Sequence, residues 1–143
     1  MRFANNRVLA YAATVTALAL MIVSVPADIQ AQSLAMRVNI PFQFHVGNTA
    51  LPAGAYMVQK TGEAVRVSDQ QGHTAIILTT AVRNRAAAVA NQLSFHRYGN
   101  DYFLSEVRWS EYSTARGLMK SKTEIQIASA LTPKRVVTAA NQR

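Results

Sequence analysis

Residues 39–58, NIPFQFHVGNTALPAGAYMV, join two alternating apolar segments through an LPAG corner at 51–54. Before the corner, every second side chain is apolar, which predicts a strand with one buried face. The residues on that face are Val38, Ile40, Phe42, Phe44 and Val46. Pro52 and Gly54 fit the second and fourth positions of a type I turn, and the alternation resumes at Tyr56. The stretch therefore predicts a strand–corner–strand unit.

Alternating or β-branched runs after the corner predict further strands. They lie at residues 55–60, 64–68, 74–82 and 122–128, in addition to a hairpin at 92–110. The run 74–82 is apolar enough to be buried on both faces. Residues 69–72 predict a turn, residues 83–92 a loop or a single frayed helical turn, and residues 110–117 a loop. This pattern predicts an all-β fold, a small antiparallel β-sandwich or barrel of about seven to eight strands.

The hairpin at residues 92–110 permits two registers. A two-residue Gly99-Asn100 turn has suitable chemistry, because glycine tolerates a positive φ, but it sets Leu93 opposite Glu106. A three-residue turn that includes Asp101 separates apolar from polar side chains, and we expect this register. Its core face carries Leu93, Phe95, Phe103, Val107 and Trp109, and its polar face carries Ser94, His96, Tyr98, Tyr102, Glu106 and Arg108.

The N-terminus has the pattern of a secretory signal peptide. A basic start precedes an uncharged apolar run at residues 8–25, and small-residue cleavage sites end at Ala27 and Ala31. We expect a signal-peptide helix within residues 1–31 and cleavage at one of these sites, with retention as a membrane anchor as the alternative. One β domain at residues 32–130 would follow, and then a poorly ordered tail at residues 131–143. The sequence thus predicts an exported protein, periplasmic or extracellular.

Two groups of motifs resemble those of a family of small exported bacterial proteins of unknown function. The first is IPFQFHVG with LPAGAYMV, at residues 40–58, and the second is FHRYGNDYFL, at residues 95–104. The resemblance covers residues 40 to about 122. It implies export and a β-rich fold, and it brings no activity with it.

The composition favours an acidic partner. The chain has 15 Lys and Arg against 7 Asp and Glu, a formal net charge of +8 that becomes about +7 once residues 1–31 are removed. This balance favours an acidic envelope polymer or another envelope protein. Export argues against nucleic acid, and the membrane would be reached only through an uncleaved signal segment. Because the chain has no cysteine, disulfides, thiol catalysis and thiolate metal sites are excluded, and no cofactor is expected.

Patterns for catalysis or metal binding are weak. His45, His73 and His96 are not spaced as metal ligands on one element, and no Gly-x-Ser-x-Gly elbow is present. We therefore expect a non-catalytic binding or structural module, with a small secreted hydrolase or a subunit of an extracellular assembly as alternatives. Tyrosine and arginine on a rigid sheet make good contact surfaces, so the hairpin supplies the candidate surface. Its residues are His96, Arg97, Tyr98, Tyr102, Glu106 and Arg108.

Overall fold

The computed structural model describes residues 34–83, 90–112 and 114–140. Their elements are β1 (Ala35–Ile40), β2 (Phe44–Val46), β3 (Thr49–Leu51), β4 (Gly54–Thr61), β5 (Ala64–Ser68), β6 (Thr74–Arg83), β7 (Asn91–Tyr98), β8 (Asp101–Arg108), β9 (Thr114–Leu118), α2 (Lys122–Ala128) and β10 (Lys134–Ala140). The predicted signal peptide and both cleavage sites lie outside these residues, as does most of the ambiguous segment 83–92.

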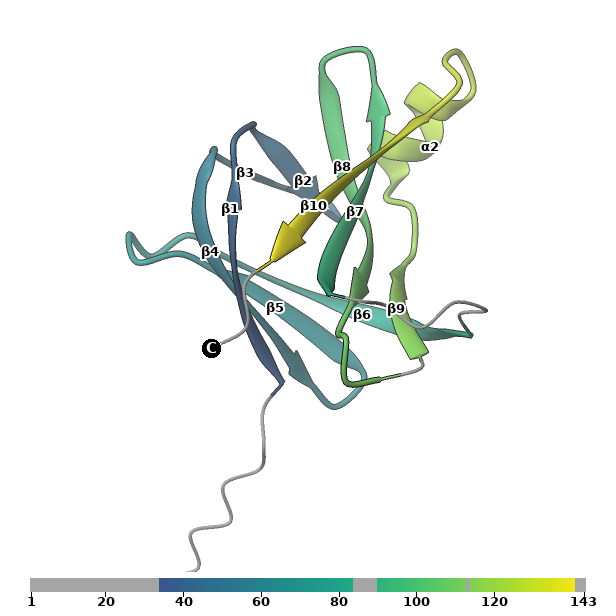
Figure 1. Cartoon of the computed structure of the whole chain (residues 1–143). Coiled ribbons are helices and arrows are strands. Elements are labelled where there is room, and N and C mark those ends of the chain that lie inside the picture. The colour runs from purple at the N-terminus through teal and green to yellow at the C-terminus, as the bar shows by residue number, and fades with distance from the viewer. Residues whose placement is uncertain (1–33, 84–89, 113, 141–143) are drawn as a thin grey trace, which may run out of the picture. The chain divides into compact units, whose positions relative to one another are not determined.

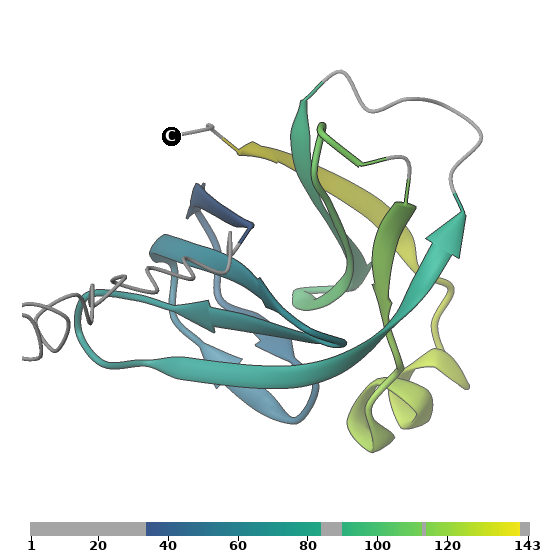
Figure 2. The same ribbon diagram turned by 90° about the horizontal axis from the view of Figure 1, so that it is seen from below.

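The ten strands belong to one sheet (Figure 1). Strands β1, β4, β5 and β6 pair in that order. β6 then pairs with β9, β9 pairs with β8, and β8 also pairs with β2 and β7. Figure 2 shows β6 as the long strand that runs from the β5 side of the sheet to β9. The prediction of a mostly β fold is confirmed. The predicted strand number was too low, and the sheet is mixed because His45 of β2 pairs in parallel with Phe103 of β8.

One face of the sheet carries the hydrophobic core. Cross-strand partners share a face, so Val58 and its partner Val67 point to the same side, and both are completely buried. The core also includes Phe44 of β2 and Phe95 of β7. The prediction that the run 74–82 is buried on both faces was wrong, because the outward residues of β6 are exposed, with Leu78 at 73%.

The predicted first strand is divided in two. β1 ends at Ile40, and β2 starts at Phe44 and pairs with β3 and β8 instead of β4. Pro41 has no backbone N–H, so a ladder ends naturally there. The corner that follows is held by Tyr56, whose hydroxyl donates a 2.6 Å hydrogen bond to the carbonyl oxygen of Pro52.

The β7–β8 hairpin contains both competing registers. Next to the turn, Tyr98 lies opposite Asp101 and Phe95 lies opposite Leu104, which is the register of the two-residue turn. A bulge then shifts the pairing, so that Ser94 lies opposite Glu106, as the three-residue turn predicted. The extra residue is Ser105, whose hydroxyl donates to the carbonyl oxygen of Ser94 over 2.9 Å. The predicted register is therefore wrong near the turn and correct beyond the bulge.

The segment predicted as the last strand, residues 122–128, is the helix α2. Ser121 caps this helix, and its hydroxyl oxygen accepts a hydrogen bond from the backbone N–H of Glu124. A Ser-x-x-Glu sequence is typical of a helix N-terminus. Ile125 is 57% exposed, so the isoleucine alternation does not reflect a buried strand face.

Two segments predicted without regular structure are strands. β9 lies within the expected loop 110–117 and extends to Leu118, and it pairs with β6 and β8. β10 lies within the tail expected to be poorly ordered, and it pairs with β7 over its whole length. Apolar and polar residues alternate only weakly in both segments. They form strands because they pair with the edges of neighbouring strands.

Candidate binding sites

The six predicted surface residues of the hairpin lie on both faces of the sheet. Arg97 is opposite Tyr102 near the turn, on the side of the core residues Phe95 and Leu104. His96 is opposite Phe103 on the other side, together with Tyr98. Arg97 stands between His96 and Tyr98 in the strand, so alternation alone turns it to the opposite face. Tyr102 joins Arg97 there because the pairing next to the turn is one residue away from the predicted register, and such a slip moves a side chain to the other face. The predicted single contact surface is therefore not present.

Arg97 and Tyr102 stabilise the turn end of the hairpin. The Tyr102 ring stacks on Phe42 with 3.9 Å between ring centroids, and Cζ of Arg97 lies 5.4 Å from the Tyr102 centroid. Nε of Arg97 donates a 2.7 Å hydrogen bond to the carbonyl oxygen of Gly99. These contacts engage both side chains within the hairpin.

Tyr98 is buried, so its prediction as a surface residue was wrong. Its hydroxyl donates to Oε1 of Glu124 on α2 over 3.2 Å, and Nδ1 of His96 lies 2.8 Å from the same oxygen. Burial raises the pKa of the Tyr98 hydroxyl, and the negative charge of Glu124 raises it further. Glu124 was not predicted as a site residue, although the Ser-x-x-Glu pattern at residue 121 would have placed it on a helix.

Glu106 and Arg108 form an ion pair at the other end of the hairpin. Nη2 of Arg108 donates to Oε1 of Glu106 over 2.6 Å, and Nη2 of Arg135 lies 4.0 Å from the same oxygen. Arg135 also donates to the hydroxyl of Ser94 over 3.0 Å. These contacts join β10 to the hairpin.

Each of the three histidines has its own neighbour. His45 stacks on Phe103, with 4.7 Å between ring centroids, whereas His73 contacts Asp69 and His96 contacts Glu124. Among the described residues, no three His, Cys, Asp or Glu side chains gather as metal ligands would.

The outer face of β1, β4, β5 and β6 is a more continuous surface, which we call the open face. It comprises the outward residues Arg37, Asn39, Met57, Gln59, Arg66, Ser68, Ile76 and Leu78. Arg37 lies opposite Met57, and Arg66 lies opposite Gln59 on one side and Ile76 on the other. No carboxylate is among these residues, and neither Arg37 nor Arg66 takes part in any ion pair found within the described residues. The open face is thus cationic and partly apolar.

A pocket of about 270 Å³ lies at the edge of the open face. Arg37, Met57 and Ser68 line one side, and the residues of the LPAG corner and the 69–71 turn complete it. The carboxylate of Asp69 accepts hydrogen bonds from the backbone N–H groups of Gln71 and His73 and contacts Nδ1 of His73. Burial raises the pKa of Asp69, but these contacts outweigh it and lower the pKa overall. Asp69 forms no ion pair with Arg37, although both residues line this pocket.

Comparison of the chain with protein-family models, with curated proteins and with solved structures gave no match. The resemblance to a family of exported proteins therefore stays a prediction. Within the part of the chain that the structure describes, no helix is both long and apolar enough to cross a membrane.

Proposed function

We propose that this protein is an exported, non-catalytic β domain that binds an acidic polymer of the cell envelope or extracellular space through its open face. One observation carries this proposal: Arg37 and Arg66 are exposed on a sheet face without a carboxylate, and no ion pair among the described residues neutralises them. Guanidinium groups bind carboxylates and sulfates through paired hydrogen bonds, and a rigid sheet holds them at low entropic cost.

The neighbouring side chains support a polymer as the ligand. Met57 lies between the two arginines in the cross-strand pattern, and Gln59 adds an amide that can donate and accept hydrogen bonds. The 270 Å³ pocket adjoins Arg37 at the edge of the open face. A chain with repeated anionic groups would contact both arginines at once, which raises its affinity above that of a single group.

We infer that the strands close as a barrel and that the chain reaches its place of action by export. The proximity of β1 and β10 supports a barrel, as does a single core cluster that includes Met36 of β1 and Ala140 of β10. The basic and apolar pattern of residues 1–31 supports export through a cleaved signal peptide. A chain without cysteine that works outside the cytoplasm depends on packing for its stability.

Binding to immobilised polygalacturonate, a carboxylated polysaccharide, tests the proposal. We expect the exported protein to be retained at about 50 mM NaCl and released at about 500 mM, because salt screens exposed charges. Neutral dextran is the control matrix. Retention that is equal on both matrices, or unchanged by salt, would contradict the proposal. If the exported protein is retained only by an immobilised envelope protein, the ligand is a protein and not an acidic polymer.

A further inference from the structure

The open face is apolar at one end. There β6 contributes Ile76 and Leu78, whose side chains are 59% and 73% exposed. The two residues are separated by one position in the strand, so their side chains stand next to each other on the same face. We call this pair the β6 apolar patch. Large aliphatic side chains that are exposed together on a sheet indicate a contact surface.

A cation adjoins the β6 apolar patch. Ile76 is the cross-strand partner of Arg66, and Leu78 is the partner of Ala64 on the same strand β5. Neighbouring strands lie about 4.8 Å apart, so one ligand can contact the guanidinium of Arg66 and the patch together. Arg66 takes part in no ion pair found within the described residues.

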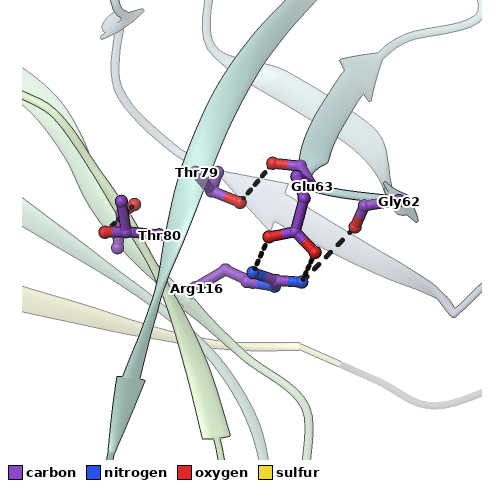
Figure 3. A network of polar contacts seen from close by, with 6 residues as sticks. Gly62, Glu63, Thr79, Thr80 and Arg116 are labelled. Carbon is purple, nitrogen blue, oxygen red and sulfur yellow. Dashed lines mark hydrogen bonds and ion pairs between the residues drawn. The ribbon is translucent and has the colours of Figure 1, made fainter.

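The carboxylate of Glu63 does not balance the charge of Arg66. Glu63 directly precedes Ala64, the partner of Leu78. Both of its carboxylate oxygens accept hydrogen bonds from the guanidinium of Arg116, over 2.6 and 3.0 Å (Figure 3). This end of the open face is therefore cationic and apolar.

The same network fixes β6 next to the patch. Thr79 follows Leu78, and its backbone N–H and its hydroxyl both donate to the carbonyl oxygen of Glu63 over 2.8 Å (Figure 3). A surface that is rigid before the ligand arrives binds it at a lower cost in conformational entropy.

An anionic ligand with apolar substituents complements this arrangement. We propose that the acidic polymer bound by the open face carries acyl esters. Its carboxylates pair with Arg37 and Arg66, and its acyl groups contact Ile76 and Leu78. This inference rests on the proposed function, because it specifies the polymer that is recognised at that same face.

Two other occupants of the open face fit less well. A lipid bilayer would place the amide of Gln59 and the hydroxyl of Ser68 among acyl chains, which is unfavourable, whereas the hydroxyl groups of a polysaccharide can hydrogen-bond with both. A second copy of the chain would bring two cationic faces together without a carboxylate between them.

Acylation of one polymer at constant charge tests the inference. The affinity of the exported protein is measured by isothermal titration calorimetry at low salt, for polygalacturonate and for its O-acetyl and O-butyryl esters of equal chain length. We expect the dissociation constant to fall with acyl length and to be at least about fourfold lower for the butyryl ester, as burial of about one methylene predicts. Equal affinities for all three polymers would overturn the inference and leave the proposed function intact, whereas no binding of any polymer would contradict both.

The double variant Ile76→Thr/Leu78→Thr tests whether the β6 apolar patch causes this preference. Threonine suits a strand but offers less apolar surface. We expect the variant to bind all three polymers equally, and polygalacturonate within about twofold of the parent. The matched control, Leu131→Thr/Val137→Thr, alters two side chains outside the open face that are each 48% exposed, and it should keep the preference. A preference that persists in the patch variant, or that the control loses equally, would contradict the assignment.

Vesicles of phosphatidylglycerol and light scattering test the two other occupants. We expect no vesicle binding that depends on the patch, and the same mass in solution for the parent and the patch variant. Vesicle binding that the patch variant loses, without a preference among the polymers, would identify a membrane as the ligand. A lower mass of the patch variant would identify an interface between two copies. Either result would overturn the inference.

Discussion

The hydroxyl of Tyr98 donates a hydrogen bond to Oε1 of Glu124 over 3.2 Å, and the two residues are only 1% and 4% exposed. This contact ties α2 to strand β7, and His96 shares the same acceptor oxygen. In a capping box, the glutamate three residues after the capping serine often accepts a hydrogen bond from the backbone N–H of that serine. In this protein the carboxylate of Glu124 contacts Tyr98 and His96 instead. Glu124 is therefore a structural residue that fixes the helix to the sheet.

Loss of the Glu124 carboxylate should destabilise the fold. Glu124→Ala leaves the buried hydroxyl of Tyr98 without an acceptor, and we expect the free energy of unfolding to fall by about 1–3 kcal/mol. Glu111 is exposed, so Glu111→Ala is the matched control and should change stability by less than about 0.5 kcal/mol. Urea unfolding followed by Trp109 fluorescence measures both. Similar losses in the two variants would show that the Glu124 contact does not stabilise the protein.

Alkaline pH should destabilise the protein through its buried tyrosines. Burial raises the pKa of Tyr56 and of Tyr98 above the ordinary value of 10.0, with further contributions from the charges of Asp69 and Glu124 respectively. The folded chain therefore holds these protons more tightly than the unfolded chain. The stabilisation is complete below about pH 10 and is lost as the pH rises through the folded-state values.

Melting temperatures between about pH 8 and 11.5 measure this effect, which the linkage of proton binding to folding requires. Tyr98→Phe should reduce the fall of the melting temperature with rising pH, because it removes one of the two buried tyrosine hydroxyls that titrate. The same change at exposed Tyr112 should leave the dependence of the melting temperature on pH unchanged. An unchanged slope in Tyr98→Phe would argue against this origin.

Gly117 should tolerate alanine poorly because of Val82. A Cβ atom at Gly117 would lie 2.7 Å from Cγ2 of Val82, whereas one at Gly54 would meet its nearest neighbour, in Tyr56, at 3.9 Å. We expect Gly117→Ala to cost about 1–3 kcal/mol of stability and Gly54→Ala to cost little. In a Val82→Ala background the cost of Gly117→Ala should largely disappear, and a cost that stays the same would rule out the steric explanation.

Much of the sheet was predictable from its local pattern. The alternation in residues 64–68 gave the bounds of β5, and the polar run 69–72 gave the turn that follows it. These features depend on neighbouring residues, so the sequence carries them directly.

The remaining features depend on contacts between distant residues. In the hairpin, turn chemistry and side-chain separation favoured different registers, and the bulge at Ser105 satisfies both. β10 is a strand because β7 offers it an edge, which its own composition does not reveal. The open face combines residues from several strands, and only the completed sheet brings those residues together.

The most direct test of the central claim is the affinity for polygalacturonate of the double variant Arg37→Gln/Arg66→Gln, measured by isothermal titration calorimetry at low salt. The control, Lys122→Gln/Lys134→Gln, removes the same charge from exposed positions on α2 and β10. We predict that the dissociation constant rises at least about tenfold for the arginine variant and stays within about twofold for the control. Equal weakening in both variants, or none in the arginine variant, would contradict binding of an acidic polymer at the open face.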